Sequence, residues 1–204
     1  MTDSTIRILI AEDQTLVRGA LATLLNFEDD FEVVATAGDG IEALALAKVH
    51  RPHVVLVDVE MPHMSGLEVV EQLHQALPDC KAIVVTTFAR PGYMQRAVKA
   101  GARGYLLKDA HVEELAGAIR RIVQGGRVMS PELMMAAMEH ANPLSDREAQ
   151  VLRLAANGMS TRQIAMDIAL TEGTVRNYLS EAISKLNASS RQEAIKLAES
   201  QGWI

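Results

Sequence analysis

What this sequence lacks narrows the classes of protein that it can encode. The chain of 204 residues contains a single cysteine, Cys80, which excludes a disulfide framework and a cysteine-rich metal site. No apolar run approaches the roughly 18 residues of a membrane span. The first ten residues also lack the basic and apolar regions of a signal peptide. We therefore expect a soluble protein of a reducing cytoplasm, with no membrane partner.

An excess of positive charge is also missing. The formal net charge is −6. Residues 1–143 contain 13 Lys and Arg against 19 Asp and Glu, and residues 144–204 contain 7 of each, so the whole deficit lies in the first part. A nucleic-acid site in the second part must therefore depend on a local cluster and not on bulk charge. No glycine-rich loop of the Gly-x-x-x-x-Gly-Lys-Ser/Thr kind is present, which argues against a nucleotide-hydrolysing enzyme.

The first part of the chain alternates short apolar runs with segments of helical periodicity. Five such strand-then-helix units predict an α/β domain with a doubly wound, five-stranded parallel sheet covered on both faces. The predicted strands are 6–11, 32–36, 54–58, 82–87 and 104–108, and the predicted helices are 16–25, 41–50, 67–77, 93–100 and 112–124. In the first helix an apolar stripe is expected to pack on the sheet, formed by Leu16, Ala20, Leu21, Leu24 and Leu25.

The second part of the chain is predicted to be entirely helical. Gly125-Gly126 is a helix stop that ends the first domain at residue 124. Ser130-Pro131 can begin one short helix in a linker over residues 125–143. From residue 144 to 204 the helix starts are two capping boxes, Ser145-Asp-Arg-Glu148 and Ser190-Arg-Gln-Glu193, and two N-caps, Ser160 and Thr171. Four helices should follow.

Polar residues stand at the ends of four predicted strands, where a doubly wound sheet places its site. They are Glu12 and Asp13 after the first strand, Asp58, Thr86 and Lys108. A single carboxylate at a strand end is usually a loop cap, but three that converge repel each other unless a cation is present. An oxygen-only set suits Mg²⁺. With a lysine ammonium and a hydroxyl beside it, such a pocket can receive phosphate, and the candidate acceptor is itself a carboxylate.

A helix-turn-helix is expected between residues 160 and 186. In its second helix an inner apolar stripe, Val175, Leu179, Ala182, Ile183 and Leu186, lies opposite the polar residues Thr174, Arg176, Asn177, Ser180, Ser184 and Lys185. Arg can bind guanine and Asn can bind adenine in the major groove, and both lie in the first turns of this helix. The simpler interpretation, a solvated helix face, fits the same spacing.

Residues 6–124 resemble the receiver domain of bacterial two-component response regulators, a CheY-like, flavodoxin-like fold. The matching motifs are Ala11-Glu-Asp-Gln14, Val57-Asp-Val-Glu-Met-Pro62, Val85-Thr-Thr-Phe88 and Ala100-Gly-Ala-Arg-Gly-Tyr-Leu-Leu-Lys-Asp109. The resemblance implies that Asp58 is the phosphoacceptor and that Lys108 contacts the phosphoryl group. It implies a switch pair, Thr86 and Tyr105, and an Mg²⁺ site formed by Glu12, Asp13, Asp58 and the main chain of Glu60.

Residues 144–204 resemble the LuxR-type DNA-binding domain, through Leu144-Ser-Asp-Arg-Glu148, Gly173-Thr-Val-Arg-Asn-Tyr178 and Ile183-Ser-Lys-Leu186. The whole chain is therefore similar to a NarL/FixJ-type response regulator. This similarity implies a sensor histidine kinase and promoter DNA as partners, and a homodimer on phosphorylation. Arg176, Asn177 and Ser180 would face bases, and Thr174 and Lys185 would face phosphates. Thr86-Thr-Phe-Ala-Arg-Pro-Gly-Tyr93 and Asn26-Phe-Glu-Asp-Asp30 resemble members that control membrane-lipid desaturation genes.

Two alternatives remain at this point. The first is an aspartyl-phosphate phosphohydrolase with Asp58 as nucleophile, but that class needs an Asp two residues further on, where this chain has Glu60, and a capping insert. The second is a DNA-binding transcription factor that works without phosphorylation and uses the first domain only to dimerise. DNA binding measured with and without a phosphodonor separates this alternative from the response regulator.

Overall fold

The computed structural model describes residues 5–87, 90–129, 135 and 142–204. The chain forms two compact units that divide after residue 134, with residues 90–93 grouped with the second unit. The division lies within the predicted linker. The short helix expected to begin at Ser130 lies outside the described residues, except for Met135.

The first unit contains a six-stranded, entirely parallel sheet with the strand order β2-β1-β3-β4-β5-β6. The strands are β1 Ile6–Ala11, β2 Phe31–Ala37, β3 Val54–Val57, β4 Lys81–Thr86, β5 Gly104–Leu107 and β6 Val128–Met129. β3 and β4 are buried at nearly every position, as expected when helices cover both faces of a parallel sheet. The chain runs from β1 outward to β2 and then returns to β3 on the other side of β1, so the strand order reverses between β1 and β3.

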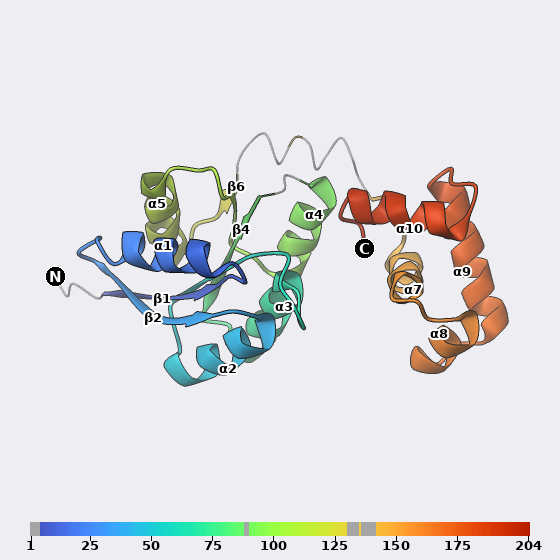
Figure 1. Ribbon diagram of the computed structural model, residues 1–204, viewed down its shortest axis with the longest axis horizontal. Helices are drawn as coiled ribbons and strands as arrows, with labels where there is room; N and C mark the ends of the chain where they lie inside the picture. The colour runs from blue at the N-terminus through green and yellow to red at the C-terminus, as the bar shows by residue number, and fades with distance from the viewer. Residues whose placement is uncertain (1–4, 88–89, 130–134, 136–141) are drawn as a thin grey trace. The chain divides into compact units, whose positions relative to one another are not determined.

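Five helices accompany this sheet: α1 Thr15–Leu25, α2 Gly40–His50, α3 Gly66–Ala76, α4 Pro91–Ala100 and α5 Val112–Val123. Figure 1 shows α1 and α5 on one face of the sheet and α2 and α3 on the other. The core beneath α5 joins alternate strand residues to the inner side of that helix, among them Ile8, Leu56, Ile83, Ile119 and Ile122. Because side chains alternate along a strand, the intervening residues face the helices of the opposite layer.

The prediction of a doubly wound parallel α/β sheet is confirmed, but the predicted number of five strands is one too few. β6 follows α5 and pairs with β5, with Gly104 opposite Val128 and Tyr105 opposite Met129. Its two residues had been assigned to the linker. A strand of two residues is too short to show any alternation of apolar and polar residues, so the sequence carries no signal for it.

The predicted inward stripe of α1 was partly wrong. Leu25 is buried and Leu21 packs against the core, but Leu16 is 86% exposed and Leu24 is 43% exposed. Ala20 is also exposed. Since this helix carries apolar residues on more than one side, its periodicity alone does not select which side faces the sheet.

The second unit consists of helices α7 Asp146–Ala156, α8 Thr161–Asp167, α9 Glu172–Lys185 and α10 Arg191–Ser200, as predicted (Figure 1). Ser145, Ser160, Thr171 and Ser190 are the N-caps, and Ser145 and Glu148 form the expected capping box. The box predicted at Ser190 is incomplete, because the Glu193 carboxylate accepts from the Ser189 backbone N–H instead. Among the described residues, no helix is long and apolar enough to cross a membrane.

Candidate functional site

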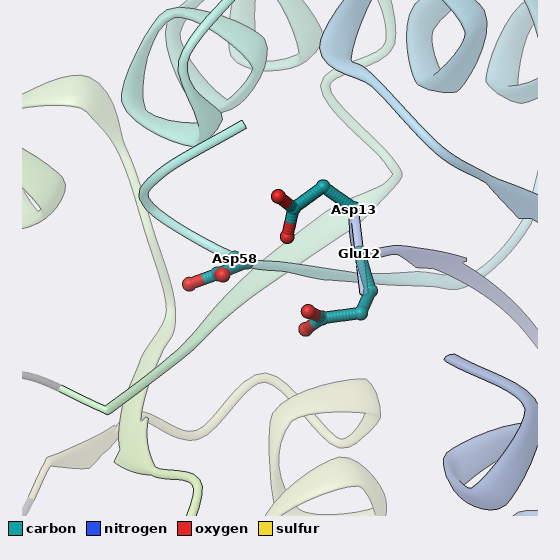
Figure 2. A group of neighbouring side chains, drawn as sticks. All are labelled: Glu12, Asp13 and Asp58. Carbon is teal, nitrogen blue, oxygen red and sulfur yellow. The ribbon is translucent and has the colours of Figure 1, made fainter. Parts of the chain in front are cut away.

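The acidic residues predicted to converge do so at the carboxyl ends of β1 and β3. Glu12 and Asp13 directly follow β1, and Asp58 directly follows β3. The Asp58 backbone N–H donates to the carbonyl of Ala11 at 3.0 Å, which keeps the two strand ends side by side. One oxygen of each carboxylate lies within 4.8 Å of one oxygen of the other two (Figure 2). This position is the reversal point of the strand order, where doubly wound sheets bind their ligands.

Lys108, the residue after β5, provides the positive charge of this pocket. Its Nζ lies 2.7 Å from Oε2 of Glu12 and 2.8 Å from Oδ2 of Asp58, and all three side chains are at most 10% exposed. The Lys108 backbone N–H also donates to the Thr86 carbonyl at 2.8 Å, which ties the end of β5 to the end of β4. The ammonium therefore bridges two buried carboxylates that arise from different strands.

Burial perturbs the acid-base properties of these groups. Loss of hydration raises the pKa of Glu12 and of Asp58, although the hydrogen bonds from Lys108 oppose the change. Burial alone would lower the pKa of Lys108, but its hydrogen bonds to Asp58 and Glu12 outweigh that effect and raise it. The ammonium therefore remains charged at neutral pH and compensates carboxylates that would otherwise repel each other.

Backbone geometry holds the acceptor carboxylate in place. The Val59 N–H donates to Oδ1 of Asp58 at 2.7 Å, while Lys108 donates to the other oxygen. Gly66, the first residue of α3, passes so close that a Cβ there would lie 1.8 Å from the Asp58 carbonyl oxygen. Glycine is therefore required at this position. On the other side of the pocket, the Arg18 guanidinium donates to the backbone carbonyls of Glu12 and Asp13 and stabilises the loop between β1 and α1.

Thr86 and Tyr105, predicted as a switch pair, lie on the same face of the sheet. Tyr105 is opposite Val84 in the register of β4 and β5, and Thr86 is two residues beyond Val84, so the two side chains are diagonal neighbours. Thr86 is 1% exposed and Tyr105 is fully buried. The burial of Tyr105 fits core packing as well as the switch role that the family resemblance implies.

The donor set of the pocket fits Mg²⁺. It offers carboxylate oxygens only, without a His or Cys ligand, and hard divalent cations prefer such ligands. Glu12 and Asp58 are buried, whereas Asp13 is exposed at the mouth of the pocket. Glu60, whose main chain was also predicted to take part, is exposed two residues beyond Asp58.

The second unit presents the polar face predicted for α9. The inner stripe is confirmed: Ile183 is partly buried against the core of this unit, and the other four residues, Val175, Leu179, Ala182 and Leu186, are buried in it. Asn177 and Ser180 are exposed, and Thr174 is half-buried, with its hydroxyl 2.9 Å from that of Thr171. The Arg176 guanidinium is 64% exposed and has one solvated ion pair, 3.2 Å long, with Glu172 one turn earlier on the helix.

Comparisons with known proteins cover both units. Residues 8–120 match the family of response regulator receiver domains, and residues 142–198 match the luxR family of bacterial regulatory proteins. The chain is 52% identical to the uncharacterized transcriptional regulatory protein YvfU of Bacillus subtilis and 50% identical to the transcriptional regulatory protein DesR of the same organism. Each match spans 98% of this chain and at least 99% of the relative. The chain is a two-component response regulator of the LuxR family.

Solved structures agree with this assignment. The crystal structure of ChrA, the response regulator of a heme-sensing two-component system, has a TM-score of 0.59 and 33% identity to this response regulator, over 98% of this chain and 100% of ChrA. Proteins of this family regulate transcription and are not enzymes, so the phosphohydrolase alternative is not supported.

Sequence reasoning missed one contact in the second unit of this response regulator. Lys185, predicted to face a DNA phosphate, has its Nζ 2.8 Å from both carboxylate oxygens of Glu148; the side chain of Lys185 is 43% exposed and that of Glu148 is 2% exposed. Glu148 had been recognised only as a capping residue. The two residues are 37 positions apart, and no spacing rule within one helix relates them. The contact of Arg18 with the loop of the acidic pocket was missed for a similar reason, since the acceptors are backbone carbonyls.

Proposed function

We propose that this response regulator accepts a phosphoryl group on Asp58 from a phosphohistidine of a sensor histidine kinase, with Mg²⁺ in the acidic pocket. A homodimer then forms and binds promoter DNA through α9. The observation that carries the proposal is the arrangement of Asp58, with one oxygen bonded to the Val59 N–H and the other to Lys108 beside two further carboxylates. In this pocket one fixed cation offsets part of the charge of three carboxylates, and a divalent metal ion would offset the rest.

In the transfer step, a carboxylate oxygen of Asp58 forms a bond to phosphorus as the bond between phosphorus and the imidazole nitrogen breaks. The electron pair of that bond returns to the imidazole, which leaves as neutral histidine after proton exchange with water. Lys108 shifts from carboxylate to phosphoryl oxygens, since an ammonium can pair with either. Mg²⁺ held by Glu12, Asp13, Asp58 and the Glu60 main chain would neutralise charge on the transferred group.

The signal then reaches the surface through the face of the sheet that Thr86 and Tyr105 share. The Thr86 hydroxyl donates to a phosphoryl oxygen at Asp58, and the position of Tyr105 changes with that of Thr86, its diagonal neighbour. Two molecules then dimerise through the changed surface of their receiver domains. Pairing raises the effective concentration of two weak DNA-binding units without any new base contact.

On DNA, the exposed face of α9 enters the major groove. Arg176, Asn177 and Ser180 face bases, Thr174 faces a phosphate, and α10 supplies a contact between the two DNA-binding units. The ion pair of Arg176 with Glu172 is exposed on both sides, so breaking it for a base contact costs little. A two-fold dimer predicts paired half-sites in the operator.

The cytoplasm is the proposed location, where both kinase and DNA are accessible. Control of lipid-desaturation genes is the proposed output suggested by the similarity to DesR. The identity to YvfU is slightly higher than that to DesR, so identity alone does not assign the target genes. The operator sequence must do so.

The test combines intact mass with light scattering during size exclusion. Wild type, Asp58→Ala and a control, Asp79→Ala, which removes an exposed aspartate, are each measured with and without Mg²⁺ and acetyl phosphate. We expect wild type and the control to gain one phosphoryl mass and shift toward a dimer, and Asp58→Ala to do neither. Uptake by Asp58→Ala would move the acceptor elsewhere. No uptake by wild type would favour a factor that works without phosphorylation.

DNA binding is tested by selecting duplexes from a random pool with the phosphorylated protein. We expect Arg176→Ala to lose about 1–3 kcal/mol on the selected operator and much less on a scrambled duplex. Equal losses on both duplexes would reassign Arg176 to a phosphate contact.

A further inference from the structure

Within the described part of the DNA-binding unit, one carboxylate is nearly inaccessible, that of Glu148 in the first turn of α7. Its charge is compensated by Lys185, the last residue of α9, whose Nζ lies 2.8 Å from each carboxylate oxygen. The pair therefore joins the beginning of α7 to the end of the helix proposed to read DNA. It is an ion pair between helices, unlike the solvated pair of Arg176 and Glu172 within α9.

The Glu148 carboxylate has a second partner that fixes its position. It accepts a hydrogen bond of 2.7 Å from the Ser145 backbone N–H as part of the capping box of α7. Burial alone would raise the pKa of Glu148, but the hydrogen bonds from Lys185 and Ser145 outweigh this and lower it. The anion is thus anchored to the backbone of α7, and any residue that pairs with it is held at a defined place.

Two features set Lys185 apart from a lysine that contacts DNA phosphates. Two of its three N–H donors are directed to one carboxylate, and the pair as a whole is formally neutral, so an approaching phosphate gains little attraction from it. The Lys185 side chain is 43% exposed, but truncating it leaves the Glu148 carboxylate, which is 2% exposed, without its counter-charge, and this is costly. The ion pair of Lys185 with Glu148 therefore acts as a structural tie between α9 and α7.

We propose that Lys185 contributes to DNA recognition as a positioning residue, by fixing the end of α9 to the buried Glu148, and makes no phosphate ion pair of its own. This inference rests on the proposed DNA binding by α9. Arg176 is nine residues before Lys185, so the two lie about 13 Å apart along the helix axis, and a tilt of about 5° pivoting at Lys185 would move Arg176 by about 1 Å. Base readout needs side chains placed to within about 0.5 Å, so the tie sets the angle on which recognition depends.

The two roles of Lys185 predict different salt dependence. A lysine that neutralises a phosphate releases a counterion, so its loss lowers the slope of log affinity against log salt by about one. A positioning lysine leaves that slope unchanged. Removing the buried charge as well adds no further loss, because the tie between α7 and α9 is already absent. Glu148→Gln does this without destroying the capping box, because glutamine also serves at that position.

The experiment measures binding of the full-length protein to a labelled duplex selected from a random pool and to a scrambled duplex, by fluorescence anisotropy over a series of KCl concentrations. The variants are Lys185→Met, Glu148→Gln and the double variant Glu148→Gln/Lys185→Met. Arg153→Met is the control, since it removes an exposed cation of α7 from the same unit. Emission of Trp203, the only tryptophan, which packs against the core of this unit, verifies folding of each variant.

We expect Lys185→Met to bind the selected duplex about tenfold more weakly than wild type, with an unchanged salt slope. The double variant should bind about as weakly as Lys185→Met, also with an unchanged salt slope, because both variants lack the tie. If Lys185→Met does not fold, the inference is judged from the double variant alone, on its affinity for the selected duplex and its salt slope. A double variant that binds weakly and has a salt slope lower by about one overturns the inference in favour of a phosphate contact. A loss in Lys185→Met no larger than in Arg153→Met overturns it as well. Failure of wild type to bind any selected duplex would instead refute the proposed function.

Discussion

Replacing Lys108 by methionine tests the charge balance of the acidic pocket. At 2.7 and 2.8 Å, each attraction of Lys108 for Glu12 and Asp58 is worth about 6 kcal/mol at an effective dielectric constant of about 20, before the cost of desolvation. Breaking buried pairs costs about 3–5 kcal/mol in proteins. Because both carboxylates can relax by binding a proton, we expect the lower end of this range, about 3 kcal/mol, for the free energy of unfolding at pH 8 without Mg²⁺.

The loss of stability in Lys108→Met should depend on pH, and the pKa shifts of the two carboxyl groups give the direction. The folded chain raises the pKa of Glu12 and Asp58 above their usual values of 4.5 and 3.8. It therefore binds these protons more tightly than the unfolded chain, and their contribution to stability falls as pH rises through those pKa values. Loss of the ammonium raises both pKa values further, so the deficit of Lys108→Met should grow from pH 5 to pH 8.

The assay is urea unfolding followed by far-ultraviolet circular dichroism, because Trp203 reports on the other unit. It is run at both pH values, with and without Mg²⁺. We expect Mg²⁺ to reduce the deficit at pH 8 by supplying the missing positive charge. A deficit that is the same at both pH values and insensitive to Mg²⁺ would refute this account, since it would mean that Lys108 stabilises the receiver through packing and not through charge.

Three further changes have defined outcomes. Ala169→Gly should raise the free energy of unfolding of the DNA-binding unit by about 0.5–1 kcal/mol, measured by Trp203 fluorescence, because φ at Ala169 is +53°; a decrease would contradict this. Gly66→Ala should cost more than about 3 kcal/mol in urea, since its Cβ would lie 1.8 Å from the Asp58 carbonyl oxygen; a stable variant would show that α3 can shift. Arg120→Met should cost only about 1 kcal/mol, because its partners are partly solvated. That cost should vanish in high salt, and also as pH falls, since Arg120 lowers the pKa of Asp30 and this contribution is lost on protonation. A cost unaffected by salt or pH would assign it to packing.

The sequence predicts the receiver fold well because its strands and helices are long enough to show a period. All five predicted strand-then-helix units are present, and the residues at the strand ends meet because parallel strands end at one edge. Three features could not be predicted from the periodicity of the sequence. β6 is too short for a pattern, the outward side of α1 carries leucines as its inward side does, and the contact of Lys185 with Glu148 depends on how α7 and α9 pack. Periodicity describes single elements, whereas these features arise between elements.

The acidic pocket also has consequences for synthesis of the chain. Lys108 is made 50 residues after Asp58, with which it pairs. At the roughly 5–20 residues per second of translation, the emerging receiver spends about 3–10 s with its carboxylates and no lysine to compensate them. Burying these carboxylates in that interval would be costly, so we expect β1 and β3 to pair stably only after β5 has left the ribosome. Electrostatics thus delays completion of the receiver until nearly its whole length has been translated.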